Sequence, residues 1–456
     1  MFISERVTLK VSQLVSPRSW RLGGELFWVG LGQAIAALGA VVGVRLLTGV
    51  LPPHVYGELA LGMTIATLVQ QTILSPLSGA SLRFFAPARE ANQLRYYFHG
   101  VSKLLSQGTV LLVTVAGALS MGLWISGHGK WLGLTISAFL FALLSGYSSV
   151  LDGMQNAARQ RVVVAWHGGL ASWLRFLTAV ALIGVLGAFS QVAMFGYALA
   201  SVVVLGSQFW FFRRQIYSLT TVQPTIVSSD YESWTKQMRN YAWPFATWGL
   251  FTWAQMASDR WALQMFTTTS DVGMYAVLYQ LGYYPITLLS VLVMQLITPV
   301  LFSQGGDGSD SARMQSVRRL NNLLILGTLF LTVLGTLSVF LFHQLIFLLL
   351  VAPEYHGISF LLPWMVLSGG IFASGQVASL LLMTNVNTQH LIAPKIVTAL
   401  LGVVLNFVGA YALGLQGVVF VNLLFSVVYC MWILHLTQKV REKRNSVVGG
   451  GCAPPI

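Results

Sequence analysis

The stretch RLLTGVLPPHVYGELALG (residues 45–62) and the stretch RWALQMFTTTSDVGMYAVLYQLG (residues 260–282) share one pattern. Each has an arginine inside an apolar segment, then a short turn, and then a glycine at the start of the next apolar segment. The arginine precedes the glycine by 12 residues in the first copy and by 13 in the second, so the copies are offset by 215 to 216 residues. The two stretches therefore predict an internal repeat that divides the chain into two similar halves.

The rest of the chain is strongly apolar. Its 456 residues are 55% hydrophobic and only 9% charged, and the mean hydropathy is +0.72, whereas soluble domains contain about 25% charged residues. Runs of roughly 20 apolar residues recur along the whole length, which is the length that spans a bilayer as a helix. We therefore expect an all-α membrane protein with about twelve transmembrane helices. The predicted helices cover residues 25–46, 57–81, 102–125, 131–151, 163–187, 191–212, 241–266, 272–302, 319–342, 358–384, 390–413 and 416–437.

Lysines and arginines fall in alternate gaps between these helices. Of the 26 cations, 22 lie in seven polar gaps or tails, and the gaps between them hold almost none. The positive-inside rule then places both termini in the cytosol, and it explains the formal charge of +13 without a nucleic-acid partner. The cation-rich segments are the N-terminal tail, residues 83–103, 159–161, 213–239 and 313–319, Lys395, and residues 439–444.

The longest polar stretch separates two sets of six predicted helices. Because six is an even number, both halves enter the membrane from the same side, as parallel repeats related by an axis along the membrane normal. Such repeats enclose a central cavity and open it alternately to either side. The predicted organisation is an N-terminal tail (1–24), an N-terminal half (25–212), a cytosolic linker (213–240), a C-terminal half (241–437) and a C-terminal tail (438–456).

Enzyme and metal-site patterns are missing from the sequence. Cys430 and Cys452 show neither disulfide nor metal spacing, and the eight histidines are scattered. The gaps that lack cations are also short, whereas enzymes that assemble polysaccharides usually place catalytic residues in large outward loops. We therefore expect a transporter without a metal, and a polysaccharide-assembly enzyme is the disfavoured alternative.

Three segments carry a family resemblance: LPPHVYGELALG (51–62), YAWPFATWGLFTWAQMASDRWALQMF (241–266) and DVGMYAVLYQLGYYP (271–285). They resemble the polysaccharide transporter family, which is similar to O-antigen flippases and belongs to the superfamily of multidrug exporters and lipid II flippases. The Asp-Arg pair followed by Val-Gly-x-Tyr is the most specific part.

This resemblance implies a flippase in the cytoplasmic membrane of a bacterium. Its substrate would be an oligosaccharide linked to a lipid, such as undecaprenyl pyrophosphate, and its partners would be membrane lipids and a polysaccharide polymerase or glycosyltransferases. No cofactor is implied beyond coupling to a proton or sodium gradient.

Three arginines lie inside apolar segments, where a charge is costly and points to function. Arg175 is the deepest and has no acid within one helical turn, so it is the first candidate for binding the anionic head of a substrate; an interhelical ion pair or a capped carbonyl is the alternative. Arg45 and Arg260 lie near the outer interface, where either a cavity role or simple extension of the side chain to the headgroups explains them. Asp259 is a candidate for ion coupling, or for an ion pair with an arginine across the cavity.

Polar and aromatic residues add weaker candidates. Gln70 and Gln71 could line a polar cavity or bond between helices. Tyr279 and Tyr283 could form a wall on which sugars stack, or simply pack. An ion-coupled multidrug exporter of the same superfamily is the first alternative function, but three buried arginines against one buried aspartate favour an anionic substrate.

Overall fold

The computed structural model describes residues 17–219, 230–305, 311–384 and 392–449. Within these ranges the chain forms helices and no strands, so the predicted all-α class is confirmed. Residues 1–16 and 450–456 of the predicted tails, with Cys452, and residues 220–229 of the predicted linker lie outside the described residues.

Each half is a set of long helices with a break in the second one. The first half contains α2 (Pro17–Thr48), α3 (Pro53–Val69), the π-helix η1 (Gln70–Leu74), α4 (Ser75–Glu90), α5 (Leu94–Ile125), η2 (Gly129–Trp131), α6 (Leu132–Ala157), α7 (Arg161–Leu186) and α8 (Ser190–Leu219). The second half contains α9 (Asp230–Phe266), α10 (Thr269–Leu278), the π-helix η3 (Tyr279–Tyr283), α11 (Tyr284–Gly305), α12 (Ser311–Leu350), η4 (Pro353–Leu361), α13 (Leu362–Thr384) and α14 (Ile392–Gly449).

These helices match the predicted membrane spans. Ten helical segments of the described ranges are long and apolar enough to cross a membrane. The seventh predicted span is α9, and the last two are the two parts of α14, which leaves helical geometry at Gly414 (φ 58°, ψ −134°). Adding α9 and the second part of α14 to the ten gives the twelve predicted segments. The predicted linker is shorter than expected, because α8 and α9 extend into it from both sides.

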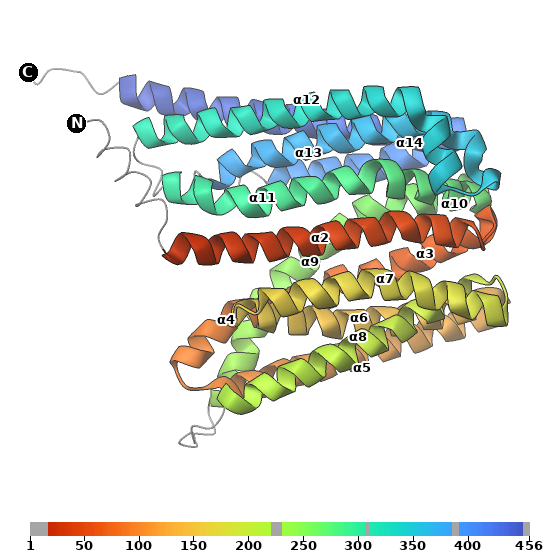
Figure 1. Ribbon diagram of the computed structural model, residues 1–456, viewed down its shortest axis with the longest axis horizontal. Helices are drawn as coiled ribbons and strands as arrows, with labels where there is room; N and C mark the ends of the chain where they lie inside the picture. Colours follow the sequence, from red (N-terminus) through yellow and green to blue (C-terminus); the bar gives the residue numbers. More distant parts are fainter. Residues whose placement is uncertain (1–16, 220–229, 306–310, 385–391, 450–456) are drawn as a thin grey trace, which may run out of the picture.

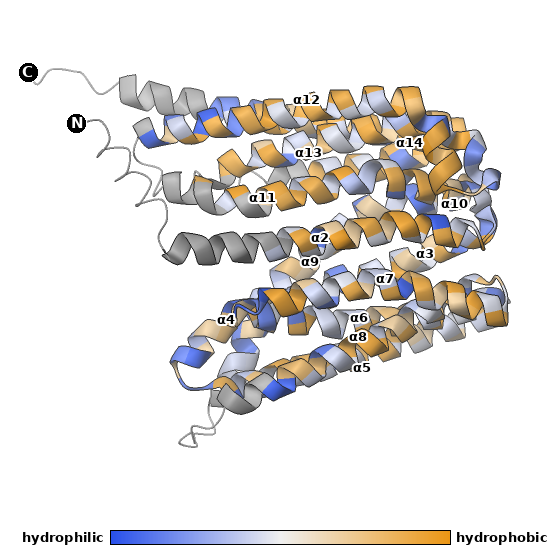
Figure 2. Ribbon diagram, viewed as in Figure 1, coloured by the Kyte–Doolittle hydropathy of each residue, from blue (hydrophilic) through white to orange (hydrophobic). Residues whose placement is uncertain are grey.

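Apolar side chains cover the outside of the bundle. Along α5 and α12, leucine, valine and phenylalanine side chains are exposed; Val110, Leu326 and Phe330 are each at least 64% accessible. Figure 2 shows the hydrophobic colour over the middle of the helices and the hydrophilic colour gathered around α4 and the start of α12. An apolar belt between polar ends is the surface that a lipid bilayer requires, so the chain is a multi-pass membrane protein.

The two halves lie side by side with their helices nearly parallel (Figure 1). Helices α4–α8 gather on one side, α10–α14 on the other, and α9 crosses obliquely between them. The start of α2 and the end of α14 lie at the same end of the molecule, which also holds the connections rich in lysine and arginine. We call this the cation-rich end, and the opposite end, with residues 49–52, 267–268 and 351–352, the bare end.

A pair of glycines joins the halves at the bare end. A Cβ atom on Gly57 would lie 1.9 Å from the carbonyl oxygen of Thr269, and a Cβ atom on Gly273 would lie 2.0 Å from that of Pro53. The two contacts are equivalent, because Pro53 and Gly57 each precede their counterpart by 216 residues. Only glycine permits this approach of α3 to α10, and the reciprocal contact is what two repeats around a shared axis produce. The repeated glycines therefore form the contact between the two halves.

Further contacts between the halves close the bare end. The ring of Tyr355 packs edge-on against Tyr56, with the ring centroids 6.2 Å apart. Three hydrogen bonds also cross between the halves: Arg45 Nη1 donates to Val351 O (2.7 Å), Tyr355 OH donates to Leu51 O (2.8 Å), and the Ala352 amide donates to Thr48 Oγ1 (3.3 Å).

Helix α9 belongs to both halves. Near the cation-rich end, Trp234 and Met238 are buried in a hydrophobic cluster of the first half, and Trp234 Nε1 donates to Gln93 Oε1 (2.8 Å). Towards the bare end, Ser258 accepts a hydrogen bond from Asn406 of α14 (2.9 Å). The same helix therefore connects the two bundles mechanically.

The second helix of each half contains a π-helical turn just before a proline. In the first half Ser75 N donates to Gln70 O, and in the second half Tyr284 N donates to Tyr279 O, so each bond spans five residues. Pro76 and Pro285 follow directly, and a proline cannot supply the next amide of the helix. The wider turns alter the helix at the level of the central cavity described below.

Candidate functional site

A cavity of about 360 Å³ lies between the two halves. Its walls come from α3, η1, α6, α7 and α8 of the first half and from α9, α10, η3 and α11 of the second. The polar and aromatic residues that line it are Tyr56, Thr64, Thr67, Gln70, Gln71, Phe141, Arg175, Phe176, Tyr197, Trp253, Arg260, Tyr279, Gln280 and Tyr284. Because both halves form the walls, any movement of one half against the other changes the cavity.

Arg175 reaches this cavity from α7 of the first half. Its guanidinium lies over the ring of Phe176, with 4.7 Å from Cζ to the ring centroid. In the part of the chain that the structure describes, Arg175 has no carboxylate partner, and its buried Nε atom has no hydrogen-bond acceptor. Within the described ranges, Arg175 therefore forms neither the interhelical ion pair nor the bond to a carbonyl group that were the alternatives to substrate binding. An arginine that keeps its charge and lacks a partner is free to bind an anion.

Arg260 reaches the same cavity from α9 of the second half, but its side chain is fixed. Nη1 donates to the carbonyl oxygen of Met256 (3.0 Å) and lies 3.3 Å from Asp259 Oδ1. The guanidinium lies over the ring of Tyr279, 4.8 Å from its centroid. One side of the guanidinium is thus held by protein groups, and the side chain remains 15% exposed.

Asp259 is buried beside Arg260 and has a full set of partners. Oδ2 accepts a hydrogen bond from Tyr275 OH (2.6 Å), and Oδ1 accepts one from the Arg260 amide (2.7 Å). The hydroxyl of Tyr275 accepts in turn from Asn422 Nδ2. The expectation of a pair across the cavity was wrong, since the carboxylate pairs with its neighbour in sequence. Adjacent side chains diverge on a helix, but the long arginine side chain bends back over Asp259.

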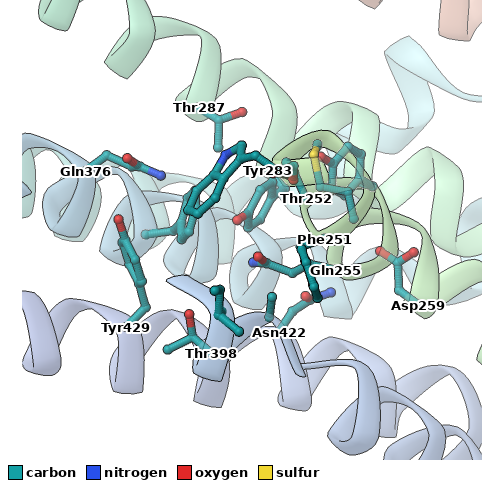
Figure 3. A pocket seen from close by; sticks show the side chains of 16 residues that line it. Phe251, Thr252, Gln255, Asp259, Tyr283, Thr287, Gln376, Thr398, Asn422 and Tyr429 are labelled. Carbon is teal, nitrogen blue, oxygen red and sulfur yellow. Dashed lines mark hydrogen bonds between the residues drawn. The ribbon is translucent and has the colours of Figure 1, made fainter. Parts of the chain in front are cut away.

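The predicted glutamines and tyrosines are divided between two cavities. Gln70 and Gln71 line the central cavity, as does Tyr279. Tyr283 does not line it. Tyr283 lies in the π-helical turn and lines a separate cavity of the second half (Figure 3), which Tyr279 also lines. The rings of Tyr279 and Tyr283 are stacked, 5.1 Å apart at their centroids.

Arg45 is not part of the cavity wall, in contrast to the predicted role in substrate binding. Its Nη1 atom donates to Val351 O at the C-terminal end of α12, where carbonyl groups lack partners within the helix and carry partial negative charge. The repeat places Arg45 and Arg260 at equivalent positions in sequence, but only Arg260 has an acid beside it and a cavity in front of it.

The central cavity continues towards the cation-rich end. A further cavity of about 510 Å³ shares Thr67, Gln70 and Gln71 with it. This cavity extends along η1 and α4 to Gly79 and along α9 to Tyr241, positions that lie progressively closer to the cation-rich end. Since the bare end is closed by the contacts described above, the described structure offers a polar path from one end only.

Several residues of the site were not predicted. Tyr56 lines the cavity from α3, and Tyr275 with Asn422 completes the surroundings of Asp259. Tyr56 and Tyr275 belong to the two repeated stretches, so the repeat itself was a usable signal for both. Asn422 follows no such signal, because it is remote in sequence from every other residue of the site. No group of three or more His, Cys, Asp or Glu that could hold a metal occurs among the described residues.

Comparison with protein families gives one match, which covers most of the chain. The family model described as "Polysaccharide biosynthesis protein" matches residues 22–304. This range contains both repeated stretches, Arg175, Arg260 and Asp259. No curated protein sequence matches the chain.

Several solved structures with a similar fold are multidrug transporters or a lipid flippase. An inward-facing multidrug resistance transporter of the MATE family, in the MOP superfamily, is 14% identical with a TM-score of 0.64, and the match covers 90% of this chain and 96% of that one. The lipid II flippase MurJ in an inward closed conformation is 11% identical with a TM-score of 0.63, over 90% of this chain and 87% of that one. The MATE transporter VcmN of Vibrio cholerae is 15% identical with a TM-score of 0.52, over 92% and 98%. At these identities the likeness establishes the fold.

Proposed function

Since the chain belongs to the polysaccharide biosynthesis protein family, we propose that it is a flippase for an oligosaccharide linked to a lipid. The lipid is proposed to be a pyrophosphate such as undecaprenyl pyrophosphate. The protein would act in the bacterial cytoplasmic membrane by alternating access, with both termini in the cytosol. It would not be an enzyme.

One observation supports this proposal above the others: Arg175 and Arg260 come from different halves and line the same cavity. A pyrophosphate must be held inside the membrane, where hydrocarbon excludes it. Two planar guanidinium groups suit phosphate oxygens and stay charged when buried. Because one arginine is on each half, an anion between them would be in contact with both halves during their movement.

The proposed orientation rests on the distribution of lysine and arginine. If the cation-rich end is cytosolic, the structure is closed towards the outside and its polar path leads to the cytosol, where lipid-linked oligosaccharides are made. Glycosyltransferases would supply the substrate there, and a polymerase would use it on the other side. Membrane lipids surround the apolar belt.

The coupling of transport to an ion gradient is proposed to involve Asp259. Its carboxylate contacts Arg260, so a proton or a sodium ion at Asp259 would weaken that ion pair and free Arg260 for the substrate. Asp259→Asn should then abolish the dependence of transport on external pH or sodium. Transport by Asp259→Asn with an unchanged rate and an unchanged pH response would exclude coupling through this residue.

An ion-coupled exporter of organic cations is the main competing function, because similar folds include multidrug resistance transporters. A cavity for cations should expose carboxylates. Here the central cavity is lined by Arg175 and Arg260, and the nearby Asp259 is already paired. The charge of the wall therefore favours an anionic substrate.

The decisive experiment measures where lipid-linked oligosaccharide accumulates. In a strain without the gene, we expect it in the cytosolic leaflet, and wild-type protein should restore transfer to the outer leaflet. Arg175→Met should be inserted normally and fail to restore transfer, whereas Gln107→Leu, an exposed change on α5 outside the cavities, should restore it. An unchanged leaflet distribution in the deletion strain, or full restoration by Arg175→Met, would contradict the proposal.

A further inference from the structure

The second half contains its own cavity of about 260 Å³, enclosed by α9, η3, α11, α13 and α14. Figure 3 shows polar side chains from several of these helices directed into it. Helices α3 and α6–α8 contribute no residue to its wall, so this cavity is distinct from the one between the halves. Within its wall, the proposed transport cycle gives a role only to Asp259, the candidate for ion coupling.

Aromatic rings form much of the wall of this cavity. Six rings line it: Trp248, Phe251, Tyr279, Tyr283, Phe372 and Tyr429. Phe372 lies between Tyr283 and Tyr429, with ring centroids 6.0 Å and 5.0 Å away. Such a wall offers flat apolar faces, on which the C–H groups of a sugar ring can lie.

Polar side chains also line this cavity. The side-chain amides of Gln255 and Gln376 line the cavity. In the part of the chain that the structure describes, the buried hydroxyl of Tyr429, another residue of the wall, has no hydrogen-bond partner. A buried polar group without a partner is costly, so the Tyr429 hydroxyl calls for water or a ligand. Amides and hydroxyls donate and accept at once, as the hydroxyl groups of a sugar do.

The charge and the volume of the cavity narrow the class of ligand. Its charged residue, Asp259, already accepts from Tyr275 and pairs with Arg260, which leaves an uncharged space. A volume of about 260 Å³ holds roughly nine water molecules at about 30 Å³ each, which is the space of one pyranose ring. A neutral sugar would fit this space.

The position of the cavity connects it to the arginines. Met256 and Tyr279 line both cavities, so they form the boundary between them. The ring of Tyr279 is 4.8 Å from the Arg260 guanidinium. A sugar in the cavity of the second half would therefore be a short distance from a pyrophosphate bound to Arg260.

We propose that the cavity of the second half is a sugar subsite, which binds a neutral sugar of the lipid-linked oligosaccharide while the arginines bind its pyrophosphate. This inference rests on the proposed function and adds the determinant of sugar recognition. It also predicts that recognition of the lipid pyrophosphate and recognition of the sugar can be separated by mutation.

The test compares three lipid probes on the purified full chain. They are undecaprenyl pyrophosphate alone and the same lipid carrying one glucose or one N-acetylglucosamine. Wild-type protein should bind at least one glycosylated probe more tightly than the bare lipid. Gln376→Leu and Tyr429→Phe should lose about fivefold to tenfold in affinity for that probe and keep the affinity for the bare lipid. Arg175→Met should weaken all three, and Gln107→Leu none.

The other possible outcomes contradict either the flippase function or the sugar subsite, and they can be told apart. If wild-type protein binds no probe, the proposed flippase function fails. Equal binding of bare and glycosylated lipids, or unchanged affinities in both Gln376→Leu and Tyr429→Phe, overturns the sugar subsite and leaves the flippase intact. A change in sodium dependence alone in these variants would assign the cavity to a cation instead. Tyr429→Phe removes only a hydroxyl without a partner, so it tests the subsite even if Gln376→Leu unfolds.

Discussion

The two halves of the molecule are alike where they meet and different where they face the cavity. At the bare end, Gly57 and Gly273 make reciprocal contacts. In the cavity, the first half presents Arg175, which has no carboxylate partner among the described residues, whereas the second half presents Arg260 paired with Asp259. A repeated fold thus keeps the contact that holds the halves together and varies the chemistry on each side of the substrate path.

The largest loss of stability is expected when Asp259, the acid paired with Arg260, is replaced. Asp259→Asn leaves Arg260 as an uncompensated charge, which should lower the free energy of unfolding by about 3 kcal/mol. Thermal unfolding in detergent would measure it. Adding Arg260→Gln should restore most of the stability, because the unpaired charge is then gone, while transport stays impaired. If Asp259→Asn alone unfolds at the same temperature as wild type, the ion pair does not stabilise the fold.

The next effect tests the equivalence of the halves. Gly57→Ala and Gly273→Ala each place a Cβ atom against a backbone carbonyl oxygen, at 1.9 Å and 2.0 Å. We expect each to cost about 2–3 kcal/mol of stability, with nearly equal values for the two. Gly117→Ala is the matched control, since a Cβ atom there would meet nothing within 4 Å. Clearly unequal losses would mean that the contact is not a symmetric one.

The unpaired arginine should behave in the opposite way to the paired one. Arg175→Met leaves no buried charge unpaired, so the free energy of unfolding should stay within about 0.5 kcal/mol of wild type. Transport should fall roughly 30-fold, the loss of about 2 kcal/mol of charged hydrogen bonding to the substrate. Arg175→Lys should recover part of the transport activity. A strong loss of stability in Arg175→Met would instead assign this arginine to packing.

The smallest effect concerns the closure of the bare end. Tyr355→Phe removes one hydrogen bond between the halves, to Leu51 O, which should shift the equilibrium towards an open bare end about fivefold. Spin labels at the exposed positions 50 and 354 would report the distance between the halves. Tyr411→Phe, at an exposed tyrosine of α14, should change nothing. An unchanged distance distribution in Tyr355→Phe would show that this bond does not control opening.

The fold was predictable from the sequence because its signals are local. Each apolar run has the length of a bilayer, and the cations sort the connections into two groups, so class, number of helices and the division into halves needed no tertiary information. The helix ends were less accurate. For example, α12 continues to Leu350 beyond the predicted end at 342, because hydropathy alone does not mark where a helix turns.

The candidate site was predictable only in part. A buried arginine is visible in the sequence as an expensive residue, and Arg175 and Arg260 both proved to line the cavity. Arg45 has the same signal and instead binds the carbonyl oxygen of Val351. The direction of a side chain depends on the rotation of its helix and on the neighbouring helix, and neither is encoded within the segment itself.

The sequence by itself determined that the chain crosses a membrane in two similar six-helix halves, because hydrophobicity and charge act on each segment separately. Tertiary structure decided that Arg175 and Arg260 share a cavity, that Asp259 is paired with its neighbour, and that the bare end is closed. These features depend on contacts between residues hundreds of positions apart, such as Tyr355 with Leu51, and packing between helices alone brings such residues together.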